Sequence, residues 1–337
     1  MPVLVFELLH QAPFHAGLGG ELSESAETIP SDTLWGALCD TAHFIKRGES
    51  LFGNLPSIRV SSVFPRCGRT RFLPMPFLPV GQRSANADAD SPDDPAQGKK
   101  WKKVKYVSEA VFDTLVQGLQ PPQPSRADGF LATDGESARL PETIIENAVI
   151  PANTLDRLTN NASPWQRAEV SYNTAEGCGS WFLVSVDEKQ VETVTELVTT
   201  LGERGIGGER SAGRGRFQVE KYPDLYTGPL ALEAGNHSWF ITLSRYLPTK
   251  EEVDRGLLDN AAYNTVVRGG FCGGFRKRKM RLCLEGGAFR ADIMPPPYGK
   301  VKNVAPEAWK SRDGHPLWLC GMAFPAFYTP QHKEVTP

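Results

Sequence analysis

The 337-residue sequence lacks the cysteine and histidine spacings that build metal sites and many hydrolytic centres. Its six cysteines are scattered without a C-x-x-C pair, and it contains neither an H-E-x-x-H motif nor a histidine next to an aspartate. A structural zinc site or a disulfide framework is therefore not expected, and a reduced cytoplasmic setting fits best. We expect no metal, no cofactor and no catalytic residue.

Signals of membrane association are also missing. No apolar run reaches the length that spans a bilayer, and the first residues, MPVLVFELLHQ, lack the basic start of a secretory signal. We therefore expect no membrane partner.

An overall excess of positive charge is absent as well, because 37 basic residues face 39 acidic ones and the net charge is −2. Phosphate binding, however, depends on local clusters. Three basic clusters stand out, at residues 99–105 (KKWKKVK), 204–216 and 276–281 (RKRKMR). One such run is usually a solvated surface. Three of them on a slightly acidic chain favour a shared polyanionic ligand, and Trp101 among the lysines offers a stacking or anchoring surface.

The apolar pattern predicts an α+β fold. A strand at 3–9 precedes a helix that begins near Pro30 with Ser31 as its N-cap, and a strand at 180–186 leads into a helix at 187–204 and a strand at 217–221. This order is the outline of a ferredoxin-like domain at 1–225, with one strand poorly defined and an insertion at about 55–178. A second, more divergent ferredoxin-like domain is expected at 236–337. Its expected elements are a strand at 238–243, a hairpin around 285–288 and a closing strand at 317–327.

Part of the insertion, residues 81–98, has no sizeable apolar side chain beyond alanine. It cannot bury enough surface to offset its ordering entropy, so we expect a mobile loop. Its acidic residues are interpreted as a solvated run and not as metal ligands; they are Asp88, Asp90, Asp93 and Asp94.

The most informative segment is GIGGERSAGRGRF, residues 205–217. Its five glycines permit positive φ angles and close approach of backbone N–H groups to an anion, while Arg210, Arg214 and Arg216 supply charge and Ser211 a hydroxyl. It is not a Walker A loop, because an arginine and a glycine replace the required Lys and Ser/Thr. It is not a dinucleotide fingerprint either, because the helix precedes the glycines. A surface hairpin with incidental arginines is the alternative.

His15 is the one candidate for a general base, since imidazole titrates near neutrality and could deprotonate an RNA 2′-hydroxyl. No partner for it is visible in the sequence. A hydrogen-bonding or structural role is favoured.

Placed after the second helix, GIGGERSAGRGRF resembles the glycine-rich loop of the RAMP superfamily of CRISPR proteins. The chain is more specifically similar to subunit four of type III-A (Csm) effectors, in the Cas-five group. The resemblance extends over most of the chain through IPSDTLWGALC (29–39), KKWKKVKYVS (99–108), NTLDRLT (153–159), RGGF (268–271), RKRKMRLCLEGGAF (276–289) and GHPLWLCGMAF (314–324). The acidic loop after Val80 has no counterpart in this pattern.

The resemblance implies two ferredoxin-like domains and a non-catalytic, RNA-binding role. Such subunits grip the repeat-derived 5′ tag of the guide RNA (the crRNA), dock the large subunit with palm domains and abut the backbone RAMP subunit. The residues expected to bind RNA are His15, Lys100, Lys103, Arg157, Gly207, Gly208, Arg210, Ser211, Arg214, Arg268 and Arg276. Two alternatives stay open: a RAMP-type endoribonuclease that processes guide precursors with His15 as base, and a structural subunit that binds only protein.

Overall fold

A nine-stranded sheet occupies the first 225 residues, with the order β10-β1-β9-β3-β4-β5-β6, β11 on β1 and β2 on β9. The computed structural model describes residues 1–18, 22–53, 56–79, 82, 95–272, 274–312 and 316–331. All pairings in this sheet are antiparallel except β5 with β6. The strands are β1 (Val3–His10), β2 (Arg59–Val60), β3 (Phe64–Cys67), β4 (Thr70–Pro74), β5 (Tyr106–Ser108), β6 (Phe130–Leu131), β9 (Cys178–Ser185), β10 (Phe217–Val219) and β11 (Asp224–Leu225).

One face of this sheet is covered by α1 (Ser31–Ile45) and α5 (Val191–Arg204), which pack against each other. Leu4, Phe6 and Leu8 alternate toward this face and join the apolar stripes of both helices in one core. Along the chain, β1, α1, β2–β3, β9, α5 and β10 follow one another as strand, helix, strand, strand, helix and strand. The short strands β2 and β3 fill the position that the sequence left poorly defined, and they lie within the expected insertion at 55–178.

The opposite face of the sheet is buried by two other parts of the chain. Val5 and Trp181 point to this side and pack with α3 (Glu109–Val116) and with Trp239 and Tyr328 of the C-terminal half. The two halves of the protein therefore share a hydrophobic core. The remaining helices of the insertion are α2 (Pro95–Trp101) and α4 (Asp134–Ser137), and short 3₁₀ helices lie at η1 (Glu49–Leu51), η3 (Thr174–Glu176) and η4 (Glu188–Gln190).

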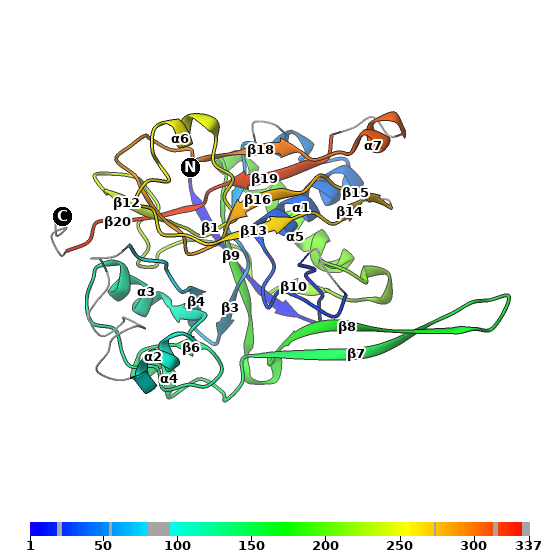
Figure 1. The fold of residues 1–337 in the computed structure, drawn as a ribbon, viewed down its shortest axis with the longest axis horizontal. Coiled ribbons are helices and arrows are strands. Elements are labelled where there is room, and N and C mark those ends of the chain that lie inside the picture. Colours follow the sequence, from blue (N-terminus) through cyan, green and yellow to red (C-terminus); the bar gives the residue numbers. More distant parts are fainter. Residues whose placement is uncertain are drawn as a thin grey trace.

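The C-terminal half is built from a three-stranded sheet, β17-β12-β20, and three two-stranded pairs, β13-β16, β14-β15 and β18-β19. Figure 1 shows these strands in the upper part of the view, and β19 lies beside α1. Their bounds are β12 (Trp239–Thr242), β13 (Thr265–Arg268), β14 (Phe271–Cys272), β15 (Phe275–Arg276), β16 (Met280–Cys283), β17 (Ala288–Arg290), β18 (Gly299–Asn303), β19 (Trp318–Met322) and β20 (Pro325–Tyr328); α6 is Lys250–Asp254 and α7 is Glu307–Arg312.

Two predictions for this half are wrong. The segment at 285–288 is not the turn of a hairpin, because β16 pairs with β13 whereas β17 pairs with β12. It instead docks on the insertion, where the Phe77 N–H donates to the Gly286 carbonyl oxygen at 2.8 Å. The apolar run at 317–327 is two strands in different sheets, since β19 pairs with β18 and β20 with β12.

A long two-stranded arm leaves the large sheet, formed by β7 (Ile145–Leu155) and β8 (Ala162–Tyr172). Figure 1 shows it projecting well beyond the rest of the fold. The base of the arm is buried at Val170 and Tyr172, whereas Leu158 at its tip is 95% exposed. The sequence did not indicate these strands, because most of their side chains face solvent and follow no apolar alternation.

Two cysteines also depart from expectation. Cys67 of β3 and Cys178 of β9 occupy opposite positions in the pairing of these strands and form a disulfide. They are 111 residues apart in the chain, so no sequence spacing could reveal the pair. The expectation of reduced cysteines without a disulfide is wrong for this pair.

Ser31 is the first residue of α1 and not its N-cap, a position that Pro30 takes. Its hydroxyl accepts a hydrogen bond from the Arg245 N–H at 2.8 Å and so joins the two halves of the chain. The expected mobile loop at 81–98 lies outside the described residues, except for Gln82 and for 95–98, which belong to α2. The four aspartates of that loop lie outside them too. Within the described part of the chain, no helix is both long and apolar enough to cross a membrane.

Candidate nucleic-acid interface

The glycine-rich loop, residues 205–216, connects the end of α5 to β10 and contains the 3₁₀ helix η5 (Arg210–Ala212). Backbone hydrogen bonds fix both ends of the loop. The Ile206 N–H donates to the Gly215 carbonyl oxygen at 3.0 Å, the Gly208 N–H to that of His15 at 2.9 Å, and the Gly215 N–H to that of Pro13 at 2.9 Å. The loop is therefore fixed against the segment that follows β1.

The glycines of the loop serve this packing. Gly207 and Gly215 have φ angles of +93° and +71°, and a Cβ would lie 2.3 Å from the His15 carbonyl oxygen at the first and 1.9 Å from that of Ile206 at the second. Gly213 also has a positive φ of +79° but faces open space, whereas Gly208 does not have a positive φ. The closest approaches at Gly207 and Gly215 are thus to the protein's own backbone, and the approach of an anion to the loop stays a prediction.

The outer edge of the loop presents unused hydrogen-bond donors. Within the described part of the chain, the N–H groups of Glu209, Arg210 and Ser211 have no acceptor, because they open the first turn of η5. The Ser211 hydroxyl is also exposed and without a protein partner there. Three successive N–H groups and a hydroxyl form a donor set suited to an anion.

Carboxylates orient two arginines of the loop, Arg210 and Arg214, and also Arg204 at the end of α5. Arg204 and Arg210 both donate to Oδ2 of Asp40 on α1, at 3.0 and 3.4 Å. Arg214 forms an ion pair with Glu169 of β8 at 3.0 Å. Arg216 is exposed and makes no ion pair with any described residue. Because a guanidinium has five N–H donors, Arg210 keeps most of its donors free.

His15 lies beneath the loop and has lost most of its solvent exposure. Its side chain is hydrogen-bonded through Nδ1 to the Ala168 carbonyl oxygen at 2.9 Å, and Gly207 and Gly208 pack on its backbone and ring. Of the expected residues, His15, Gly207, Gly208, Arg210, Ser211 and Arg214 are therefore brought together. The arrangement favours a positioning role for His15 over that of a general base.

A neighbouring buried histidine strengthens the base of the loop. His10 lies opposite Phe217 in the pairing of β1 with β10, and its Nε2 is 2.7 Å from the Ser180 Oγ. Burial, with a smaller contribution from the Arg66 charge, lowers the pKa of His10 to about 3. It is thus a neutral core residue at physiological pH.

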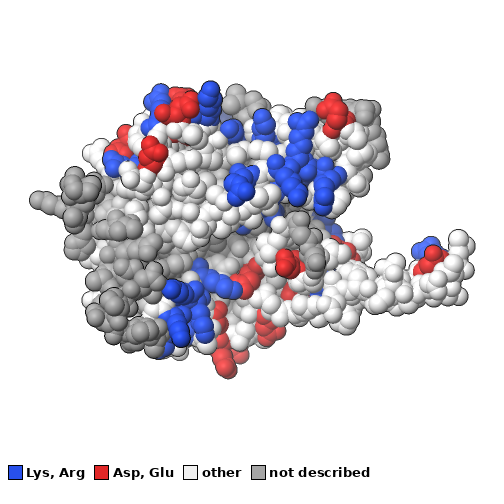
Figure 2. Space-filling model, in the orientation of Figure 1, with Lys and Arg blue, Asp and Glu red and all other residues white. Residues whose placement is uncertain are grey.

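A second basic surface lies on the basic ribbon, residues 265–281 (β13 to β16). Figure 2 shows blue side chains gathered over these strands, separated by an uncharged surface from another blue group over α2. Arg276 is exposed and stacks on the exposed ring of Phe271, with 5.6 Å from its Cζ to the ring centroid. Arg268 is instead buried and donates to Asp32 at 2.8 Å, to the Gly17 carbonyl oxygen at 2.9 Å and to Thr33 at 2.9 Å. It therefore joins the ribbon to the start of α1 and does not reach the surface, which departs from the role expected for it.

The lysine-rich segment is placed on and after α2. Lys100 and Lys103 are exposed, whereas Trp101 is 5% exposed and belongs to the core. Trp101 is thus an anchor and not a stacking surface. Arg157 lies at the exposed tip of the β7–β8 arm, so the structure does not bring Lys100, Lys103 or Arg157 to the loop.

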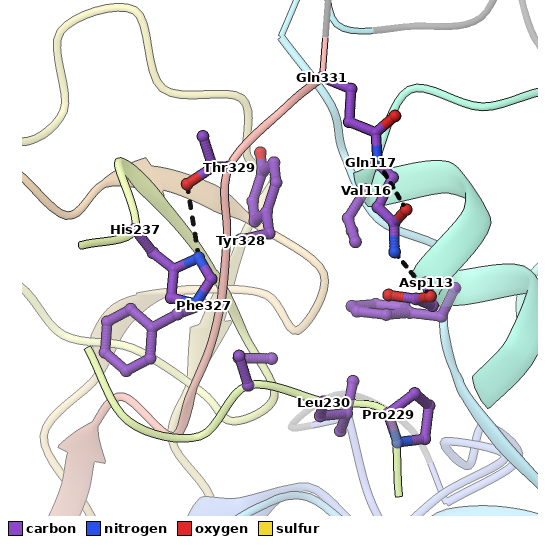
Figure 3. A pocket seen from close by; sticks show the side chains of 13 residues that line it. Asp113, Val116, Gln117, Pro229, Leu230, His237, Phe327, Tyr328, Thr329 and Gln331 are labelled. Atoms are coloured by element: carbon purple, nitrogen blue, oxygen red, sulfur yellow. Dashed lines mark hydrogen bonds between the residues drawn. The ribbon is translucent and has the colours of Figure 1, made fainter. Parts of the chain in front are cut away.

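The surface also has two hollows away from this loop. One, of about 320 Å³, lies between α3 and β20 and is lined largely by apolar side chains. Its polar groups bind one another, since Gln117 donates to Asp113 and accepts from Gln331, as Figure 3 shows. The other, of about 360 Å³, lies beside the base of the arm and contains Glu24 and Glu27. Neither hollow offers the basic lining that a polyanion requires.

Sequence reasoning missed three residues that shape the interface: Asp40, Phe44 and Glu169. A signal existed for two of them. Asp40 and Phe44 are one helical turn apart, on the side of α1 opposite to the buried Leu38 and Ala42. An aromatic residue on the polar side of an amphipathic helix could have been noticed.

Within the described residues, no group of three or more His, Cys, Asp or Glu side chains could hold a metal ion. No protein-family model matches the sequence. Among curated proteins, the chain is similar to the CRISPR system Cms protein Csm4 of Thermococcus onnurineus (strain NA1), with 26% identity over 303 residues, 88% of this chain and 90% of that protein.

Solved structures show the same fold. One match is a chain of the Csm3-Csm4 subcomplex of a type III-A CRISPR-Cas interference complex, with a TM-score of 0.64, 14% identity and coverage of 98% of this chain and 100% of the other. Another is a chain of a Csm1-Csm4 cassette in complex with cA4, with a TM-score of 0.58, 18% identity and coverage of 98% and 99%.

The chain thus has a mixed α+β fold, which it shares with chains of type III-A CRISPR complexes. Its sequence is similar to that of a Csm4 protein, which confirms the resemblance that its motifs indicated.

Proposed function

We propose that this chain is the subunit of a type III-A CRISPR effector complex that binds the repeat-derived 5′ tag of the guide RNA. The observation that carries the proposal is the donor set of the glycine-rich loop. Three N–H groups, the Ser211 hydroxyl and the partly free guanidinium of Arg210 lie together on a loop that hydrogen bonds hold in place. These donors suit the phosphates of a single strand.

Other basic groups extend this surface. Arg216 continues it along the loop, while Arg276, Lys100, Lys103 and Arg157 are exposed at separate places and are proposed to contact the strand or its neighbours farther away. His15, Gly207, Gly208, Arg214 and Arg268 are assigned to holding the loop and α1 in position. Since the tag does not vary between guides, bases can be contacted without limiting the choice of target.

We further propose that the chain docks the large palm-domain subunit onto the backbone RAMP subunit. Structures of related proteins pair Csm4 with Csm1 and with Csm3, which supports two separate protein interfaces. The proposed units are two ferredoxin-like domains, at 1–225 with an insertion at about 55–178, and at 236–337. The strand–helix–strand–strand–helix–strand order around β1, β9, α1 and α5 supports the first of them.

A non-catalytic role is also part of the proposal. The His15 Nδ1–H donates to a backbone carbonyl oxygen, which leaves Nε2 as the basic nitrogen, but the residue is only 7% exposed and is therefore poorly placed to reach a 2′-hydroxyl. The competing function, a RAMP-type endoribonuclease, requires this side chain at the surface.

Co-expression with the large subunit, the backbone subunit and a guide precursor tests the proposal. RNA recovered with the tagged chain should begin with repeat sequence, and the Arg210→Ala variant should recover less of it. Recovery of RNA without a repeat-derived end, or of none, would contradict the proposal. Incubation of the purified chain with repeat RNA without metal should leave the RNA intact; cleavage that His15→Ala abolishes would establish the nuclease.

A further inference from the structure

Phe44 is an exposed aromatic residue beside the glycine-rich loop to which no role has been assigned. It lies near the end of α1, and its side chain is 65% exposed. It is the sole exposed large hydrophobic side chain of α1 and α5, all of whose residues are described. A phenyl ring exposed on an otherwise polar helix surface is available to stack on a ligand.

One face of the ring is already covered by Arg204. The guanidinium carbon of Arg204 lies 4.4 Å from the ring centroid of Phe44. The same guanidinium donates to Asp40 at 3.0 Å and to the Thr41 hydroxyl at 3.1 Å, so its orientation is fixed from three sides. The high exposure of Phe44 places its other ring face in solvent.

This aromatic–arginine stack is connected to the loop. Asp40 also accepts a hydrogen bond from Arg210 at 3.4 Å, and it therefore holds both arginines on the same side of α1. One carboxylate against two guanidinium groups leaves the cluster with a net positive charge. A flat apolar surface next to surplus positive charge matches a nucleotide, whose base stacks while its phosphate pairs with arginine.

We propose that the open face of Phe44 stacks on one base of the bound RNA strand, with Arg204 behind the ring and Arg210 directed at a phosphate of the same stretch. This inference rests on the proposed function and adds a base-binding site to it. A protein partner is less well matched. Protein hot spots lie within a buried apolar patch, whereas Phe44 is surrounded by charged and hydroxyl groups.

The test uses synthetic guide RNAs that carry 2-aminopurine at successive tag positions, bound to the assembled complex. Stacking quenches this base, so one position should be quenched with the wild type and become bright with Phe44→Ala. The affinity should fall about tenfold, the size expected for one base–aromatic stack. Phe44→Trp should retain both the quenching and the affinity.

Two controls separate the possible results. Tyr222 is 64% exposed and lies outside the cluster, so Tyr222→Ala should change neither signal. A guide with an abasic site at the quenched position should bind the wild type and Phe44→Ala equally.

An unchanged quenching pattern in Phe44→Ala, while Arg210→Ala still weakens RNA binding, would overturn this inference and leave the proposed function standing. If Phe44→Ala prevented assembly with the protein subunits without altering any 2-aminopurine signal, the residue would be a protein contact and the inference would again fail. If neither variant affected RNA binding, the proposed function itself would fail.

Discussion

The glycine-rich loop and the basic ribbon look alike in sequence, because both combine several arginines with several glycines. In the structure they differ. The loop keeps its backbone fixed and its outer N–H groups free, and Asp40 and Glu169 orient its arginines. The ribbon buries Arg268 among protein acceptors and leaves Arg276 at the surface. Tertiary contacts, and not the density of basic residues, decide which charges are available to a ligand.

The largest expected effect separates two arginines of the ribbon, Arg268 and Arg276. Arg268→Ala removes the partner of buried Asp32 and three hydrogen bonds, and it should lower the free energy of unfolding by about 3–5 kcal/mol. Arg276→Ala, at an exposed position, should change it by about 0.5 kcal/mol or less. Chemical denaturation of both variants measures the difference. Equal stabilities would show that Arg268 is not the structural residue described above.

A smaller effect separates two glycines of the loop. Gly215→Ala places a Cβ 1.9 Å from the Ile206 carbonyl oxygen at a positive φ, and it should cost roughly 2 kcal/mol or more. Gly213→Ala has a similar φ but open space, and should cost about 1 kcal/mol. Thermal unfolding of the two variants provides the comparison. The reverse order would mean that the loop is not packed as described.

The pH dependence of stability should distinguish the base of the loop from the ribbon. The pKa of His10 is lowered in the folded state to about 3, so above pH 6.5 the imidazole is neutral both folded and unfolded. As the pH falls below 6.5, the unfolded chain takes up a proton that the folded chain does not, and the stability provided by neutral His10 is lost. Between pH 6.5 and 5 the free energy of unfolding of the wild type should fall by roughly 2 kcal/mol more than that of His10→Gln.

Denaturation at several pH values measures this slope. The absolute stability of His10→Gln will also change, because the ring stacks on Tyr172. The informative quantity is therefore the difference in pH dependence, and parallel curves for the two proteins would rule out a buried neutral His10.

Much of the framework around the loop follows from sequence patterns. The apolar stripes of α1 and α5 and the continuous apolar run of β9 predicted these elements closely, since each helix buries one side in the same core and β9 is buried on both faces. The glycine-rich loop was placed correctly between a helix and a strand. Gly207 and Gly215 make room for the protein backbone, and the expectation that the glycines of the loop let an anion approach stays a prediction.

Long-range contacts explain what the sequence could not provide. The pairing of Cys67 with Cys178, the burial of Arg268 and the capture of two arginines by Asp40 all join residues far apart in the chain. The β7–β8 arm escaped prediction for a different reason. A ribbon with two solvent-exposed faces needs no alternation of apolar and polar residues.

A salt titration of guide RNA binding tests directly whether the glycine-rich loop holds RNA through phosphate contacts. Each single-strand phosphate contact contributes about 0.7 to the slope of log affinity against log salt. Arg210→Ala should therefore weaken binding and flatten the slope by about 0.7 in the assembled complex. Arg255→Ala, an exposed arginine of an ion pair near α6, should leave both unchanged. If Arg210→Ala retained the wild-type affinity and slope, the loop would not be the site that holds the RNA.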